Sequence, residues 1–384
     1  MKNRWLLPEG ISDLLPAEAR DLEHLRRTLL DGYVRHGFEL VLPPLVEYLD
    51  SLLTGQGGDL DLKTFKLVDQ LSGQSLGVRA DITPQVSRID AHLLSANQGI
   101  NRLCYAGSVL HARPEGFLDS REPLQAGAEL YGFDGIAADI EIIGLMLDSL
   151  ALADFGDVLL SLGHIGVFRA LAASAELSPQ QAETLLAMMQ DKNVAAVRGQ
   201  VEAWALDGMW RKAFSLLPTL YGGREILAQA REKLPDLSLI GKALDELEAV
   251  CQAFPQQAVH IDLAELRVDN YHTGLLYAAY GSDGHDAVAR GGRYDGLGGY
   301  FGRSRPATGF SFDLRKFLGR LPQDERRPAI AVALADAADA AEEIARLRAG
   351  GETVVVDYGM EANSTRDGSR RLLKQNGKWV VLGD

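Results

Sequence analysis

The chain has 384 residues, of which 46% are hydrophobic and 24% charged, and this composition predicts a globular protein with a large core and two or three domains. Its net charge of −14 argues against binding nucleic acid through bulk charge, because phosphate contacts need clustered Lys and Arg side chains. With only Cys104 and Cys251, no signal-peptide pattern and no apolar run long enough for a bilayer, we expect free thiols, no membrane contact and a cytoplasmic location.

Periodicity predicts the elements of the first part of the chain. Apolar residues at helical spacing indicate a helix over residues 17–36, with this buried stripe: Leu22, Leu25, Leu29 and Tyr33. The short strand FELVLPP follows, and TFKLVDQLSGQSLGVRAD predicts a hairpin that turns near Gly73. A further helix is expected to start at Thr83, with Pro84 at its first position.

The segment SVLHARPEGFLDSREPLQAGAELYG, residues 108–132, predicts two strands joined by a long charged tip. A helix over residues 137–153 and the strand DVLLSL follow it. The pattern is then helical from about residue 165 to 255, where Ser178-Pro179-Gln180-Gln181 is typical of a helix start. We interpret this block as an all-helical insertion.

Strands return at AVHIDLA, GLLYAAY and AVARGG, and GGRYDGLGGYFG predicts a tight turn between strands. The stretch PATGFSFDLRKFL is expected to enter a helix close to Gly309. Polar residues 319–328 indicate a linker, beyond which the strands AIAVALA, ETVVVDY and KWVVLGD alternate with helices over residues 337–348 and near Arg370. The predicted fold class is α+β, with an antiparallel sheet flanked by helices in residues 1–320 and a small α/β unit in residues 328–384.

One face of the strand from Pro123 to Tyr131 has an unusual set of side chains: Gln125, Gly127, Glu129 and Tyr131. Glycine would leave a gap in which a ligand ring could lie against the backbone, while Glu129 accepts a hydrogen bond and Gln125 both donates and accepts. This pattern fits the floor of a small-molecule pocket. Taken alone, the strand fits better a sheet face exposed to water, or a Glu129 paired with an arginine.

Two further stretches carry candidate binding residues. In GVRADITPQ, Asp81 beside Thr83 could hold an ammonium group, or either residue could cap the next helix. In LRVDNYHTG, Arg267 could bind a carboxylate while Tyr271 and His272 frame a planar ring, although such a pair also occurs in ordinary packing. The eight scattered histidines and the absence of a nucleotide-loop motif predict neither a metal nor a cofactor.

Taken in order, these stretches resemble the catalytic domain of the histidyl-tRNA synthetases, which are class II aminoacyl-tRNA synthetases. They are more similar still to the non-catalytic paralogues of these enzymes, the ATP phosphoribosyltransferase regulatory subunits. The likeness covers roughly residues 5–320 and rests on LPEGISDLLP, on FELVLPPLVE (the dimer-forming motif 1), on LCYAGSVLHARP with LQAGAELYG (motif 2), on RVDNYHTG, on GGRYDGL and on GFSFDLRKF (motif 3). It implies a class II synthetase-like core.

The resemblance implies a histidine pocket. By position Gly127 lies under bound histidine, Glu129 accepts from its imidazole, and Tyr271 and His272 sit near the ring. By the same resemblance, Asp81, Thr83 and Gln125 bind the α-amino group of histidine and Arg267 binds its carboxylate. Arg113 keeps a contact with an anion.

Departures from the synthetase pattern imply that adenylation is lost. His111-Ala112-Arg113 stands where the synthetases have an Arg-x-Glu that meets the ATP phosphate. Asp313-Leu314-Arg315-Lys316 replaces a Gly-Leu-Glu-Arg whose arginine clamps ATP, and lysine lacks the planar fork that stacking requires. His272 also replaces a tyrosine, and Val268-Asp269-Asn270 replaces Gly-Leu-Asp.

The function implied is that of a non-catalytic regulatory subunit in the first step of histidine biosynthesis. It would join a short-form ATP phosphoribosyltransferase catalytic subunit as a homodimer within a hetero-octamer, activate it, and bind L-histidine as the feedback effector, with no tRNA and no membrane. A truncated histidyl-tRNA synthetase that still activates histidine is the alternative, and an ATP-dependent amide ligase on the same core is a third reading.

Overall fold

The computed structural model describes residues 5–54, 58–114, 116, 119–155, 157–265, 272–281, 286–320, 328–359 and 370–383. The chain forms two compact units, Met1–Pro322 and Gln323–Asp384. Among the helices that the structure describes, none is both long and apolar enough to cross a membrane.

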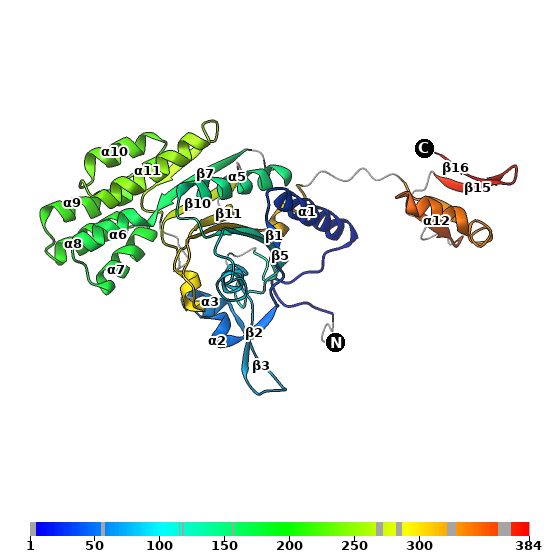
Figure 1. Cartoon of the computed structure of the whole chain (residues 1–384), viewed down its shortest axis with the longest axis horizontal. Helices are drawn as coiled ribbons and strands as arrows, with labels where there is room; N and C mark the ends of the chain where they lie inside the picture. Colours follow the sequence, from blue (N-terminus) through cyan, green and yellow to red (C-terminus); the bar gives the residue numbers. More distant parts are fainter. Residues whose placement is uncertain are drawn as a thin grey trace. The chain divides into compact units, whose positions relative to one another are not determined.

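A large sheet organises the first unit (Figure 1). Within the described residues its strand order is β1-β5-β6-β12-β11-β10-β7-β9-β8. The central run from β5 to β7 is antiparallel, while β1 joins β5 and β9 joins β7 in parallel. The strands are β1 (Glu39–Leu40), β5 (Asn101–Ser108), β6 (Leu124–Tyr131), β7 (Val158–His164), β8 (Tyr221–Gly222), β9 (Val259–Asp262), β10 (Leu275–Gly281), β11 (Ala287–Arg293) and β12 (Ala307–Asp313).

The main core lies between one face of this sheet and the helices α1 (Pro16–Arg35) and α5 (Ile136–Leu152). The predicted stripe of α1 is buried, which confirms that helix: Leu22, Leu25, Leu29 and Tyr33. From β6 this core receives Ala126, Ala128 and Leu130, so the alternate residues of β6 point to the opposite face. Cys104 and Cys251 are free and buried, as expected.

The opposite face is covered by short elements of the N-terminal part and of the β11–β12 connection. A second core cluster there includes Val86, Tyr105, Tyr131, Tyr294 and Leu297. A small antiparallel sheet, β2-β4-β3, lies nearby in the chain and contains the predicted hairpin. The elements are β2 (Val46–Tyr48), α2 (Leu49–Leu52), α3 (Gly58–Lys63), β3 (Phe65–Val68), β4 (Ser75–Val78), α4 (Thr83–Arg88), the π-helical turn η1 (Ile89–Leu93) and the 3₁₀ turn η3 (Leu297–Phe301).

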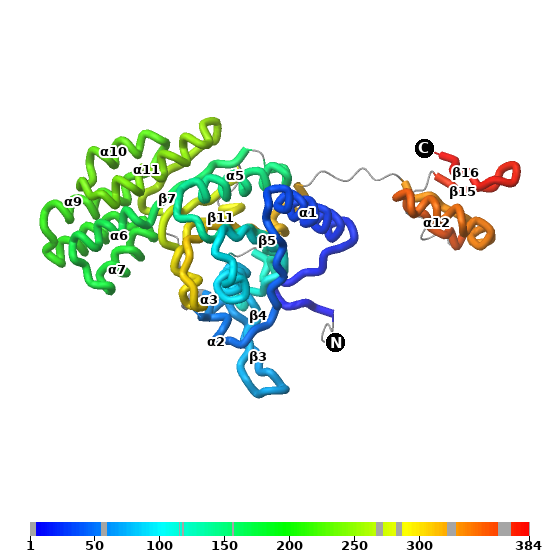
Figure 2. Tube along the Cα trace, viewed as in Figure 1, coloured from blue at the N-terminus to red at the C-terminus, as the bar shows by residue number. Residues whose placement is uncertain are grey.

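Helices α6–α11 project from one end of the large sheet, as the green part of the trace in Figure 2 shows. The Ser178 hydroxyl accepts from the backbone N–H of Gln181, and the Gln181 side chain accepts from the N–H of Ser178, which confirms the predicted helix start. The elements are α6 (Ile165–Ser174), α7 (Pro179–Gln190), α8 (Val194–Ala203), α9 (Gly208–Leu216), η2 (Leu217–Thr219), α10 (Glu225–Lys233) and α11 (Ser238–Ala253).

The second unit is a four-stranded sheet in the order β14-β13-β15-β16 with one helix, among its described residues. Two predictions from the sequence were wrong. The residues after Arg370 form strand β15 rather than a helix, and Gly309 lies inside strand β12, with only a single 3₁₀ turn, η4 (Leu314–Phe317), after it. The elements are β13 (Ile330–Ala333), α12 (Ala341–Ala349), β14 (Val354–Asp357), β15 (Arg371–Gln375) and β16 (Lys378–Leu382).

Candidate functional site

Strand β6 lies between β5 and β12, and its register places three candidate residues in a row on the face opposite the main core. Glu129 stands between Leu103 and Gly309, and Gly127 stands between Tyr105 and Ser311. Because alternate residues of a strand share a face, Gln125, Gly127 and Glu129 all point the same way.

Glu129 is the buried centre of a cluster of hydroxyl groups. Its side chain is only 1% exposed. Tyr105 donates a hydrogen bond of 3.0 Å to one carboxyl oxygen of Glu129, and the Tyr294 hydroxyl donates to the other. The Tyr105 hydroxyl lies 3.1 Å from that of Thr83. Glu129 therefore does not lie on a solvated sheet face, and no arginine among the described residues pairs with it.

Burial changes the acidity of this carboxyl group. The loss of hydration raises the pKa of Glu129 to about 8, against the opposing effect of the two tyrosine hydroxyls that would stabilise the anion. Burial therefore favours the protonated form of Glu129 in the ligand-free protein. A hydrogen-bond donor or cation bound beside it would favour release of that proton.

Glycines make room for this cluster. A Cβ atom on Gly309 would fall 1.5 Å from a carboxyl oxygen of Glu129, so the carboxylate lies directly against the glycine backbone. A Cβ atom on Gly127 would fall 2.6 Å from the Tyr105 hydroxyl oxygen and 2.4 Å from the carbonyl oxygen of Phe310. In this structure the gap predicted above Gly127 is thus occupied by the Tyr105 side chain.

Gln125 connects the strand to the segment that begins α4. Its amide nitrogen donates to Asp81 at 2.7 Å and to the Ser311 hydroxyl at 3.1 Å, while its oxygen accepts from the backbone N–H of Ile82 at 2.9 Å. Asp81 also accepts from the backbone N–H of Thr83 at 3.1 Å. The helix-start alternative for Asp81 is therefore confirmed, while its binding of an ammonium group stays a prediction.

His272, which lies shortly before β10 in the chain, contacts this cluster through its ring. Its ring meets that of Tyr294 edge to face, with centroids 6.4 Å apart. A Cβ atom on Gly292 would fall 2.6 Å from the His272 ring, so the imidazole lies against β11. His272 is thereby linked through Tyr294 to Glu129. Of the other candidates, Arg113 is exposed in the β5–β6 connection, and Arg267 and Tyr271 lie outside the described residues.

Residues at the motif 2 and motif 3 positions make structural contacts instead. The Nε2 atom of buried His111 lies 3.0 Å from the carbonyl oxygen of Ala80, which holds the end of β5 against the segment carrying Asp81. Asp313 accepts from the backbone N–H groups of Leu124 at 2.9 Å and Arg315 at 3.0 Å, so it joins the start of β6 to the end of β12. Lys316 is exposed.

Sequence reasoning missed three members of the site: Tyr105, Tyr294 and Ser311. Tyr105 of β5 and Ser311 of β12 both stand opposite Gly127 in the strand register. Aligning β5 and β6 as a hairpin would have placed Tyr105 there, but the sequence offers no such alignment for Ser311. Tyr294 belongs to the GGRYDGL stretch, which was treated as a turn. Its contact with Glu129 spans 165 residues of sequence and leaves no local pattern.

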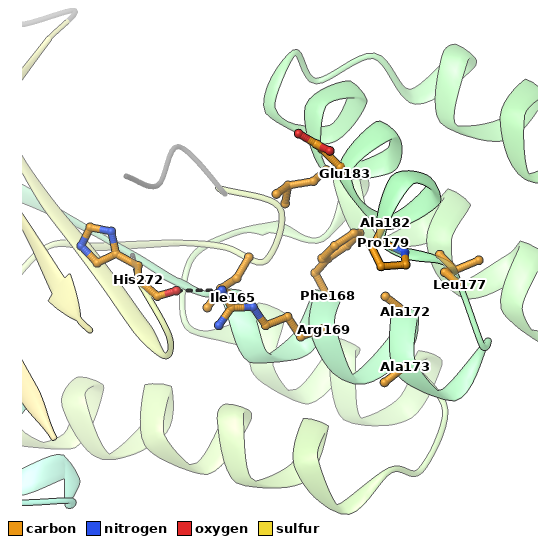
Figure 3. A pocket seen from close by; sticks show the side chains of 11 residues that line it. Ile165, Phe168, Arg169, Ala172, Ala173, Leu177, Pro179, Ala182, Glu183 and His272 are labelled. Atoms are coloured by element: carbon orange, nitrogen blue, oxygen red, sulfur yellow. Dashed lines mark hydrogen bonds between the residues drawn. The ribbon is translucent and has the colours of Figure 1, made fainter. Parts of the chain in front are cut away.

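Two cavities lie in the described part of the first unit. One of about 390 Å³ lies between α6, α7 and His272 (Figure 3), and one of about 480 Å³ lies along β7, β9 and β10. His272 lines the first cavity, whereas Gln125, Gly127 and Glu129 line neither of the two.

Comparison with known families gives two matches that together span most of the chain. A family model described as Histidyl-tRNA synthetase matches residues 10–317, and one described as ATP phosphoribosyltransferase subunit HisZ C-terminal domain matches residues 327–382. A protein of Neisseria meningitidis serogroup C / serotype 2a, named ATP phosphoribosyltransferase regulatory subunit, is 65% identical over 378 residues, 98% of this chain and 99% of that protein. A protein of the same name from Ralstonia nicotianae is 51% identical over 379 residues, 98% of this chain and 97% of that protein.

Solved structures show the same fold. The ATP phosphoribosyltransferase regulatory subunit/histidyl-tRNA synthetase from Bacillus halodurans has a TM-score of 0.82 at 26% identity and covers 95% of both chains. The histidyl-tRNA synthetase from Nostoc has a TM-score of 0.76 at 20% identity and covers 100% of this chain and 97% of that one. The predicted class II synthetase-like fold is confirmed.

Proposed function

The chain belongs to the family of ATP phosphoribosyltransferase regulatory subunits, and we propose that it activates a short-form catalytic subunit and senses free histidine for feedback inhibition. Membership confirms the resemblance drawn from the sequence motifs, and the subunit is a non-catalytic one of the HisZ type. We expect the complex in the cytoplasm, where its buried thiols stay reduced.

The observation that carries histidine sensing is the buried Glu129 with its hydroxyl donors beside the Asp81–Gln125 pair. A buried carboxyl group whose pKa is close to neutrality can accept a hydrogen bond from an imidazole N–H and become the anion as it does so. Asp81 and Gln125 offer oxygens to an ammonium group. Together these residues suit the two nitrogen-bearing ends of histidine.

The remaining parts of the proposed pocket rest on the resemblance. Arg267 would bind the carboxylate of histidine, and Tyr271 with His272 would border its ring. Tyr105 takes part as well, because its hydroxyl stands over Gly127 and contacts both Glu129 and Thr83. We infer that bound histidine replaces some of the hydrogen bonds of the Tyr105 hydroxyl. Binding of the effector would then rearrange the side chains of the pocket.

The contacts at the motif 2 and motif 3 positions support the loss of adenylation. Phosphoryl and adenylyl transfer depend on fixed positive groups around the phosphates. Here His111 is buried against Ala80, Asp313 adds a carboxyl group, and Lys316 points into solvent.

Exposed apolar side chains around motif 1 support a homodimer. Leu42, Leu45 and Tyr48 are 77%, 49% and 50% exposed in the single chain, and exposed apolar side chains can be buried when a dimer forms. We propose that this homodimer forms part of a hetero-octamer of four regulatory and four catalytic chains. Histidine would inhibit by binding one assembly state more tightly than another, since a ligand shifts only equilibria between states of different affinity.

The test is phosphoribosyl-ATP formation by a short-form catalytic subunit, alone and with this chain, each with and without histidine. The proposal expects this chain to raise the rate and histidine to lower it. A rate that this chain leaves unchanged would contradict the partnership. Histidine-dependent ATP–pyrophosphate exchange by the chain alone would instead support the truncated synthetase.

A further inference from the structure

The cavity between α6 and α7 has the character of a small-molecule site separate from the pocket on β6. Its volume of about 390 Å³ falls in the range of ligand pockets. Most of its wall is apolar, formed by side chains such as Phe168, Leu177 and Leu186. Figure 3 shows α6 and α7 forming one side and His272 the other.

Arg169 is the arginine among the described residues that line this cavity. Arg169 donates from Nη2 to the carbonyl oxygen of His272 at 2.8 Å and from Nη1 to that of Thr273 at 3.4 Å. A guanidinium group has five N–H donors, so these two bonds orient Arg169 and leave further donors for a ligand. A planar guanidinium pairs best with a carboxylate.

The charge of Glu183, which also lines the cavity, narrows the chemical classes of ligand that the cavity could bind. Glu183 of α7 is exposed and carries the opposite charge. A single arginine beside a glutamate is poorly suited to a polyphosphate, which needs several cations, and the apolar wall is poorly suited to a sugar. An apolar body with one carboxylate satisfies both the wall and Arg169.

We propose that this cavity is a second effector site that binds an amphipathic monocarboxylate, with the carboxylate on Arg169 and the apolar body against Phe168, Leu177 and Leu186. Arg169 joins the cavity to the backbone of His272, whose side chain belongs to the Glu129 cluster. Occupancy of the cavity therefore changes the affinity for histidine. This coupling rests on the proposed histidine pocket, whereas binding in the cavity does not.

Phenylpropionate is a suitable probe, with phenylpropanol and phenylpropylamine as its neutral and cationic isosteres. Titration calorimetry on the full chain should show saturable binding of phenylpropionate and weaker binding of both isosteres. Arg169→Gln should weaken phenylpropionate roughly tenfold or more and remove its advantage over phenylpropanol, because a hydrogen bond to a charged group is lost. Arg198→Gln, an exposed arginine on α8 outside the cavity wall, should change nothing.

Two variants test the location. Ala182→Phe should fill the cavity and abolish phenylpropionate binding, and Ala172→Leu is a smaller filling if the first variant does not fold. Absence of saturable binding to the unmodified chain, an equal affinity for phenylpropanol, or binding that survives the filling of a folded variant would overturn the site.

The coupling has its own readout. Saturating phenylpropionate should change the histidine Kd several-fold, and histidine should change the phenylpropionate Kd by the same factor, since linkage is reciprocal. Independent affinities would overturn the coupling. A chain that binds phenylpropionate but not histidine would contradict the proposed function and leave the cavity site standing.

Discussion

The two halves of the sheet face above β6 use similar polar residues in different ways. In the half around Glu129, side chains bond other side chains: Tyr105 and Tyr294 bond Glu129, and Gln125 bonds Asp81. Around Asp313, the side chain bonds the backbone at Leu124 and Arg315. The first half keeps groups that a small molecule can engage, while the second uses its polar atoms to hold strands together.

With the proposed loss of adenylation, this difference explains how the face would keep its fold without ATP. His111 and Asp313 bond backbone groups, so the polar atoms there are satisfied without a ligand. Changes in the Glu129 half should therefore alter histidine binding, and changes in the Asp313 half should alter stability alone.

Glu129→Gln should produce the largest effect on binding. Glutamine has the size and shape of a protonated carboxyl group, so the fold should survive, but it cannot become an anion when the imidazole binds. We expect histidine affinity to fall roughly ten- to a hundredfold in calorimetry, with assembly with the catalytic subunit unchanged. Glu122→Gln, which removes only a partly exposed pair with Arg315, is the control. Equal histidine affinity in the Glu129 variant and the unmodified chain would show that Glu129 is placed wrongly.

The same carboxyl group should make stability depend on pH. The pKa of Glu129 in the folded chain is about 8, above its ordinary value of 4.5, so the folded chain holds this proton more tightly than the unfolded chain does. The resulting contribution to the free energy of unfolding is complete below about pH 4.5 and is lost as the pH rises through 8. Urea unfolding without histidine should give a smaller free energy at high pH, and Glu129→Gln should flatten that slope. An identical slope in both proteins would mean that Glu129 is already ionised at neutral pH.

Gly309→Ala should destabilise the Glu129 half by about 1–3 kcal/mol, because a methyl group would overlap the carboxyl group of Glu129. Gly296→Ala is a matched control, since a Cβ atom there meets nothing within 4 Å. Thermal unfolding measures both variants. An equal loss of stability in the two variants would contradict the close contact between Gly309 and Glu129.

Asp313→Ala should cost about 1 kcal/mol, the usual value of a lost helix-start contact, with histidine affinity unchanged. Asp313→Asn keeps an acceptor oxygen and should recover most of the loss. Stability is measured by urea unfolding and affinity by calorimetry. Weakened histidine binding in a folded Asp313→Ala variant would mean that the two halves are not separate.

Lys316→Arg should have the smallest effect. The side chain is exposed, so stability should change by no more than about 0.5 kcal/mol. Restoring the arginine alone should not restore ATP–pyrophosphate exchange, because His111 and Asp313 still occupy the other positions. Exchange above background would identify Lys316 as the residue that silenced the core.

Local patterns predicted much of the fold. The cap at Ser178 and the stripe of α1 depend on residues within a few positions of one another, and both were confirmed. The strand at Gly309 was missed although Thr308, Phe310 and Phe312 alternate with smaller residues, since the charged stretch that follows was extended backwards as a helix. The hairpin of β15 and β16 was missed although Asn376 and Gly377, both with positive φ, form a favourable two-residue turn.

The site was less accessible to sequence reasoning than the fold. Alternation placed Gln125, Gly127 and Glu129 on one face, but it could not tell whether that face met water, arginine or hydroxyl groups. Tyr294 is decided by tertiary packing, because β11, β12 and β6 must assemble before its hydroxyl reaches Glu129.

The two buried thiols have a practical consequence for labelling. Burial raises the pKa of Cys104 to about 12 and also raises that of Cys251. At neutral pH the reactive thiolate form of both side chains is therefore disfavoured, so both native thiols should resist maleimide reagents. A single cysteine introduced at the fully exposed Leu71 would then carry a fluorophore by itself, in a chain that keeps all of its native residues elsewhere.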